Sequence, residues 1–150
     1  MSILERLEND MKKAAKARDT ERLGVIRFVR SQTKNLEIEL MRKLADEDVI
    51  GVLAKLAKQH REAIEQFTAG GRAELVAAEE RKLGIVTEYL PAPLDESELQ
   101  DIVSAAIEET GASTPGDMGL VMKAVMPRVK GRVEGDEVKR VVVSRLTRGE

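Results

Sequence analysis

The sequence contains no cysteine, and aromatic residues make up only 2% of its 150 residues. A chain without cysteine forms no disulfide, no zinc–thiolate site and no thiol nucleophile. The scarcity of aromatic residues disfavours strands, and it also disfavours the stacking of single-stranded bases on aromatic rings. No apolar run approaches the roughly 20 residues that a bilayer requires. Residues 1–5 show no charged leader before an apolar core, unlike a signal peptide. We therefore expect a soluble cytoplasmic protein that has no contact with a membrane.

Good helix formers dominate what is present. Hydrophobic residues make up 42% of the chain and charged residues 35%, with alanine, leucine, glutamate, lysine and arginine prominent among them. These residue types favour helices, whereas the aromatic and β-branched runs typical of strands are rare. The composition therefore predicts an all-α protein. At this length the chain forms one domain or two small ones.

Capping motifs and apolar residues at helical spacing predict four helices in an N-terminal domain, residues 1–90. Ser2 and Glu5 form a capping box before the first helix, in which each side chain satisfies a backbone N–H. The second helix is expected to start at Asp19-Thr20, the third at Asp46, and the fourth to extend through Leu90. Gly70-Gly71 is expected to end the third helix.

Pro91-Ala92-Pro93 predicts an extended hinge, because proline lacks the N–H and restricts the residue before it. A C-terminal helical domain of three helices is expected after it, over residues 94–150. Asp95 begins the first of these helices and Pro115 the second, while Pro127 is expected to close the second and Asp136 to cap the last. The predicted architecture is a four-helix part joined to a three-helix tail by a proline hinge.

The net charge of the chain is −2, but the charged residues are unevenly distributed along it. Residues 1–61 carry a net charge of +4, residues 62–109 carry −9 and residues 110–150 carry +3. Electrostatic attraction is decided locally, because salt screens it over roughly 10 Å. The negative average therefore does not argue against a nucleic-acid partner for the last segment.

No group of residues in the sequence reads as a catalytic site. The single histidine, His60, lies among polar neighbours, and we expect it to be a solvated surface residue. The acidic pairs Glu79-Glu80, Asp95-Glu96 and Glu108-Glu109 are adjacent, so on a helix their side chains diverge. No glycine-rich phosphate loop follows a strand. We expect no catalytic residue, no metal ligand and no cofactor, and the chain is predicted to be non-enzymatic.

A basic group around a glycine is the best candidate for a binding site. Its members are Lys123, Arg128, Lys130, Gly131, Arg132, Lys139 and Arg140. If they converge on one turn, they form a surface for phosphate groups. A solvated surface is the simpler alternative, since cations near a helix C-terminus are also explained by the helix dipole. Met118, Met122 and Met126 recur every four residues, as expected for core packing or for an adaptable partner groove.

The segment Gly111–Gly135 resembles the C-terminal signature of the GatB/YqeY family, which includes stand-alone YqeY-like proteins and the tail of the amidotransferase B subunit. The residues that match the family pattern are Asp117, Met118, Gly119, Lys123, Pro127, Lys130 and Gly131. The resemblance extends upstream through Glu88-Tyr89-Leu90-Pro91 and covers nearly the whole chain. It departs from the pattern at Val133-Glu134. The resemblance implies that, in the amidotransferase, this region helps to hold tRNA while transamidation occurs in other domains.

Three functional hypotheses follow. The first is a non-catalytic helical module that binds tRNA or another structured RNA, as an accessory of tRNA-dependent amidation. The second is a protein–protein interaction module that has no direct role with RNA. The third is carbon–nitrogen ligase activity in trans, with glutamine as amido-N-donor, for which the chain has no nucleotide cradle, metal carboxylates or ammonia channel.

Overall fold

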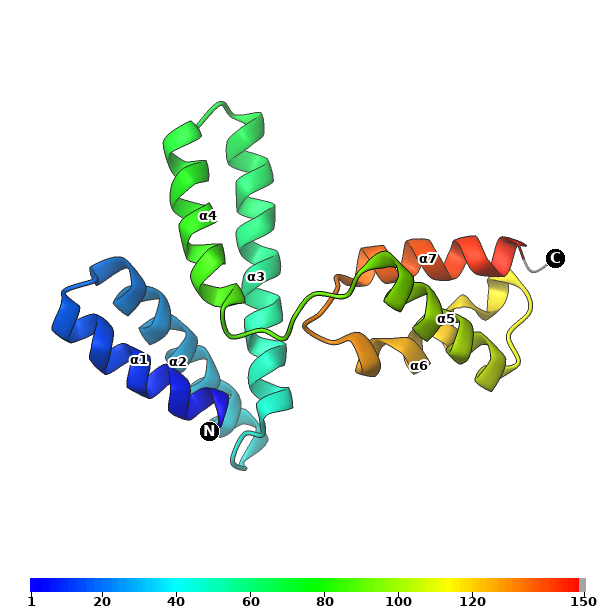
Figure 1. Ribbon diagram of the computed structural model, residues 1–150, viewed down its shortest axis with the longest axis horizontal. Coiled ribbons are helices and arrows are strands. Elements are labelled where there is room, and N and C mark those ends of the chain that lie inside the picture. The colour runs from blue at the N-terminus through cyan, green and yellow to red at the C-terminus, as the bar shows by residue number, and fades with distance from the viewer. Residues whose placement is uncertain (149–150) are drawn as a thin grey trace. The chain divides into compact units, whose positions relative to one another are not determined.

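The computed structural model describes residues 1–148, and all regular structure within them is helical, which confirms the predicted all-α class (Figure 1). The chain divides into two compact units, Met1–Leu90 and Pro91–Glu150. The first unit holds α1 (Ile3–Ala17), α2 (Thr20–Leu40), α3 (Asp46–Ala69) and α4 (Ala73–Thr87). The second holds α5 (Glu96–Thr110), the short 3-10 turn η1 (Pro115–Asp117), α6 (Met118–Val129) and α7 (Gly135–Arg148).

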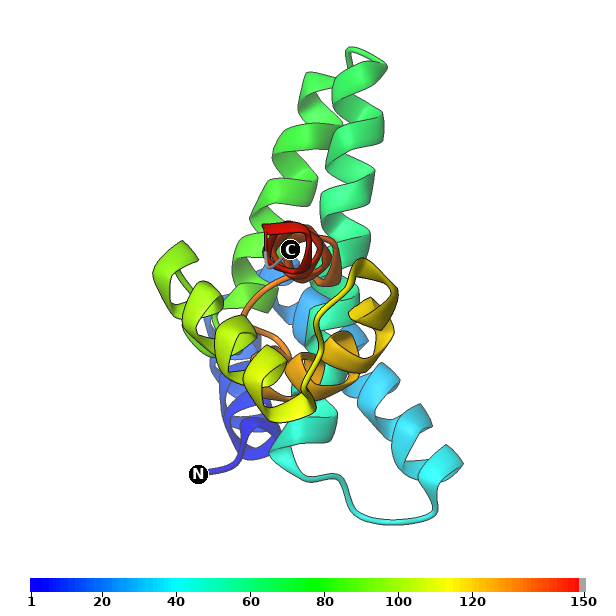
Figure 2. The same cartoon turned by 90° about the vertical axis from the view of Figure 1, so that its right-hand side faces the viewer.

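The first unit consists of two helical hairpins that share one apolar core. In both views α3 and α4 lie side by side, and α1 packs along α2 (Figure 1, Figure 2). The core is centred on leucine, isoleucine and valine side chains that are nearly or fully buried: Leu7, Ile26, Val29, Val49, Leu53 and Val86. Burial of these apolar side chains is the main force that holds the four helices together.

The second unit packs three helices around a core that is rich in valine. Its fully buried members include Val103 of α5, Val121 and Val125 of α6, and Val138 and Val142 of α7. The methionines 118, 122 and 126 are partly buried and pack against this core. Their contacts match the core-packing interpretation of the methionine spacing.

Several helix starts follow the predicted capping chemistry. The Ser2 hydroxyl accepts the N–H of Glu5 at 3.1 Å, and the Glu5 carboxylate accepts the N–H of Ser2 at 3.3 Å. Asp19 and Asp95 cap α2 and α5 by accepting the backbone N–H three residues further along the chain. These contacts satisfy donors that a helix N-terminus otherwise leaves unpaired.

Four predicted helix boundaries are wrong. Asp136 is not the cap of α7, which already begins at Gly135. The helix α4 ends at Thr87 rather than extending through Leu90. Asp46 is not the cap of α3, because the cap residue is Ala45, whose N–H is bound by Asp48 at 2.8 Å. Asp46 instead accepts the N–H of Ile3 at 3.0 Å and so ties the start of α1 to α3. Pro127 does not close α6, which continues to Val129. A proline removes one hydrogen bond to the preceding turn, and α6 continues past that loss for two more residues.

Candidate nucleic-acid interface

The turn between α6 and α7 is built around Gly131. Lys130 leaves the helix with φ −53° and ψ 125°, and Gly131 follows with φ 77°. This left-handed conformation is strained for any residue that has a Cβ atom. The N–H of Arg132 then donates to the carbonyl of Val129 at 2.9 Å and closes the turn. The backbone conformation at position 131 therefore favours glycine.

Arg132 attaches this turn to the segment that precedes α5. Its guanidinium Nε donates to the carbonyl of Ala92 at 2.8 Å, and its own carbonyl accepts the N–H of Leu94 at 3.0 Å. A further contact joins its guanidinium to Glu98 at 3.4 Å. Arg132 therefore has a structural role within the second unit.

The other predicted arginines are also held by carboxylates. Arg128 is paired with Glu109 of α5. Arg140 contacts Glu96 of α5 at 3.1 Å and Glu137 of its own helix at 2.5 Å. The hydrogen bond from Arg140 lowers the pKa of Glu137 below its ordinary value. Most positive charge that arginine brings to this surface is therefore opposed by a neighbouring negative charge.

Three lysines complete the predicted group: Lys123, Lys130 and Lys139. Each is exposed, and none makes a hydrogen bond or ion pair within the described residues 1–148. Lys123 lies on α6, and Lys130 directly follows the last residue of that helix. Lys139 lies on the neighbouring helix α7. Lys130, Gly131 and Arg132 are consecutive residues of the turn, and the other two lysines lie on the two helices that it connects.

Sequence reasoning missed the carboxylates that face the arginines. These are Glu96, Glu98 and Glu109, and in the sequence Glu96 and Glu109 stand out only as members of adjacent acidic pairs. They lie between 19 and 44 residues from their arginine partners. The only signal in the sequence was the change from a net negative to a net positive segment near residue 110, which predicts attraction but not which residues pair.

The expectation that His60 is a solvated surface residue is also wrong. Its side chain is only 20% exposed, and its Nδ1 atom lies 2.5 Å from Oε2 of Glu79, a residue of α4. Histidine Nδ1 commonly bonds a carboxylate in this way, which fixes the orientation of the ring. No group of three His, Cys, Asp or Glu residues able to hold a metal ion occurs among the described residues. Within the same range no helix is both long and apolar enough to cross a membrane.

Replacing Gly131 with alanine should destabilise the second unit by about 1–2 kcal/mol, because the Cβ atom of alanine makes the left-handed conformation unfavourable. Thermal or denaturant unfolding measures the change. Gly119→Ala is the matched control. Gly119 lies in α6, and an added Cβ there meets no atom within 4 Å. We expect that variant to be as stable as the wild type or more stable, since alanine favours a helix. Equal destabilisation by both variants would contradict this account of the turn.

Comparison with known proteins shows the family of the chain. The model of the family described as Yqey-like protein matches residues 4–146. A relative from Saccharomyces cerevisiae, named altered inheritance of mitochondria protein 41, mitochondrial, is 38% identical over 85 residues. That match covers 56% of this chain and 46% of the relative. A protein of the same name from Lachancea thermotolerans is 37% identical over 112 residues, covering 73% of this chain and 60% of the relative.

A third protein of that name, from Pyrenophora tritici-repentis, is 29% identical over 140 residues. This match covers 90% of the chain and 75% of the relative. The chain thus spans about half the length of the Saccharomyces protein. The expectation of a cytoplasmic protein is contradicted by these relatives, all of which are named as mitochondrial proteins. The family match extends over both compact units, and the chain belongs to the Yqey-like protein family.

Proposed function

We propose that the second unit binds the phosphate backbone of tRNA or another structured RNA through Lys123, Lys130 and Lys139. The observation that carries the proposal is the difference between the arginines and the lysines of the basic group around Gly131. The arginines are paired with acidic residues of the same unit, whereas these three exposed lysines have no such partner in the described part of the chain. Lysine ammonium groups that are not paired within the protein can contact phosphate without first breaking an internal bond.

The composition of this unit favours recognition of backbone and shape. The three aromatic residues, Phe28, Phe67 and Tyr89, all precede residue 91, so the unit offers no aromatic ring for base stacking. Proteins that read folded RNA by shape contact phosphates and 2′-hydroxyl groups instead. Exposed ion pairs such as Arg128–Glu109 contribute little to stability. Arg128 and Arg140 can therefore exchange their carboxylate partners for phosphate as RNA approaches.

The resemblance to the tail of the amidotransferase B subunit supports a role as an accessory of tRNA-dependent amidation. In this role the chain holds RNA, and another protein supplies the chemistry. The methionines of α6 pack against the core of their own unit, which favours a packing role for them over an open partner groove. RNA binding is accordingly the function that the geometry supports best.

The test is the affinity of the full chain for bulk tRNA over a series of salt concentrations. Each phosphate neutralised on duplex or single-stranded nucleic acid contributes about 0.7–0.9 to the slope of log affinity against log salt. A variant with Lys123, Lys130 and Lys139 all replaced by glutamine should therefore lose about 2–3 from that slope. Arg132 is left unchanged, because its bonds to Ala92 and Glu98 hold the unit together.

The control carries the same change in net charge at another place. Lys43, Lys55 and Lys58 are exposed lysines of the first unit, and their triple replacement by glutamine should leave the slope unchanged. An equal fall of the slope in both variants would show that RNA responds only to total charge. Absence of tRNA binding by the wild-type chain at low salt would overturn the proposal and favour a protein partner.

A further inference from the structure

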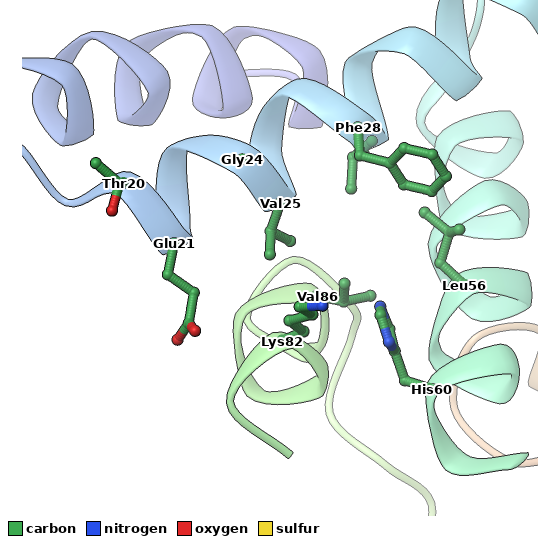
Figure 3. A pocket seen from close by; sticks show the side chains of 10 residues that line it. Thr20, Glu21, Gly24, Val25, Phe28, Leu56, His60, Lys82 and Val86 are labelled. Carbon is green, nitrogen blue, oxygen red and sulfur yellow. The ribbon is translucent and has the colours of Figure 1, made fainter. Parts of the chain in front are cut away.

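A pocket of about 440 Å³ opens between α2, α3 and α4 in the first unit. Its floor is apolar and is formed by Val25 and Val29 of α2, Leu56 of α3 and Val86 of α4. Phe28 lines it as well and is 51% exposed, which is high for so large an apolar side chain. In Figure 3 the ring of Phe28 lies close to Leu56 at one side of the pocket. A volume and lining of this kind are typical of sites for small organic ligands.

One end of the pocket is lined by two basic side chains, His60 of α3 and Lys82 of α4. Figure 3 shows the imidazole of His60 pointing from its helix toward Val86. The Nδ1 atom of His60 is committed to Glu79, but its Nε2 atom has no partner among the described residues and is not a buried atom. Lys82 lies 3.7 Å from Glu79, a long and partly exposed contact. Lys82 therefore keeps ammonium donors for a further partner, and Nε2 of His60 is a donor when the ring is protonated.

Two acidic residues, Glu79 and Glu21, lie near this pocket. Glu79 contacts both His60 and Lys82 but does not itself line the pocket. Glu21 does line it, yet Figure 3 places this residue well away from His60, and its carboxylate accepts a hydrogen bond from Arg81 at 2.9 Å. Both bases line the pocket, whereas the carboxylate that contacts them belongs to a residue that does not line it. With His60 protonated, the two bases carry two positive charges against the single carboxylate of Glu79, which leaves one positive charge for a ligand with one negative charge.

We propose that this pocket binds a small monocarboxylate with an apolar body. The apolar body lies on the floor formed by Val25, Leu56 and Val86, beside Phe28. The carboxylate accepts hydrogen bonds from Lys82 and, when the imidazole is protonated, from Nε2–H of His60, whose Nδ1 is held by Glu79. Hydrogen bonds to charged groups are the stronger ones, and they fix the orientation of a ligand that the apolar floor alone leaves undetermined.

Phenylacetate is the probe, and phenylethanol is its uncharged counterpart. Each is titrated into the isotope-labelled full chain while amide resonances are followed by NMR. Phenylacetate should shift resonances around Val25, His60 and Lys82, and phenylethanol should bind at least about tenfold more weakly, as the loss of a charged hydrogen bond implies. His60→Gln and Lys82→Gln should each weaken phenylacetate binding by about tenfold.

Lys58→Gln is the matched control, because Lys58 is an exposed base on α3 that does not line the pocket. That variant should bind phenylacetate like the wild type. The Lys82 variant decides the outcome if His60→Gln fails to fold. Equal binding of the acid and the alcohol, shifts confined to other helices, or no shifts at millimolar phenylacetate would each overturn the proposal. The pocket lies in the first unit and the RNA surface in the second, so either proposal can fail without the other.

Discussion

Replacing Leu53 with alanine is expected to destabilise the first unit by about 2–5 kcal/mol and to leave the second unit unchanged. Leu53 is fully buried in the core shared by the four helices of residues 1–90. Truncation to alanine removes the transfer free energy of the lost carbon atoms and leaves a cavity that its neighbours fill only in part. This core contains no residue of the second unit, so the damage should be confined to α1–α4.

Leu99→Ala makes the reciprocal change, because Leu99 is 2% exposed and belongs to the core of the second unit. Hydrogen exchange of amides in increasing denaturant measures the stability of each unit separately. We expect two unfolding transitions, with each variant lowering only the transition of its own unit. A single transition that both variants lower equally would contradict the predicted division into a domain of residues 1–90 and one of residues 94–150.

Local chemistry in the sequence was sufficient to predict the helical class and several helix starts. Ser2, Asp19 and Asp95 act over three residues, so the sequence shows both the capping side chain and the N–H that it binds. Asp46 failed as a predicted cap because its partner, the N–H of Ile3, is 43 residues away. Pro127 failed as a stop signal because the helical packing of Val125 and Val129 on the core outweighs one missing hydrogen bond.

The candidate site, too, could be predicted only where it depends on residues that are close together in the sequence. Positive charge near Gly131 was evident from the sequence, and the left-handed backbone conformation there explains why the residue is a glycine. Which charges remain unpaired was not evident, because it depends on α5 lying against the arginines of α6 and α7. The His60–Glu79 pair was missed for a similar reason. Its two residues are 19 positions apart and meet only when α3 and α4 form a hairpin.

Tyr89→Phe should lower the stability of the first unit by about 1.5–3 kcal/mol at neutral pH, the range for a hydrogen bond to a charged group. Tyr89 is only 4% exposed, and its hydroxyl donates to Oδ2 of Asp10 at 2.5 Å. The guanidinium of Arg6 lies 5.1 Å from the centre of the tyrosine ring. Phenylalanine keeps the ring packing but leaves the Asp10 carboxylate without this donor. The loss should appear in denaturant unfolding of the first unit.

The same contact makes the first unit sensitive to alkaline pH. Burial, followed by the hydrogen bond to Asp10, raises the pKa of Tyr89 well above its ordinary value of 10.0. A group whose pKa is higher in the folded state contributes its full stability below the unfolded pKa and loses it as pH rises toward the folded one. The wild type should therefore lose stability above about pH 10, and Tyr89→Phe should lack this contribution.

Tyr89 is the single tyrosine of a chain that has no tryptophan, so tyrosinate absorbance reports on this residue alone. In the folded wild type the absorbance should rise only at pH values at which the first unit unfolds. Asp10→Asn retains an acceptor but removes the negative charge that disfavours tyrosinate, and its tyrosine should therefore ionise at lower pH. Ionisation near pH 10 in a chain that is still folded would show that the hydroxyl is open to water. The contact between α1 and the end of the first unit would then be absent in solution.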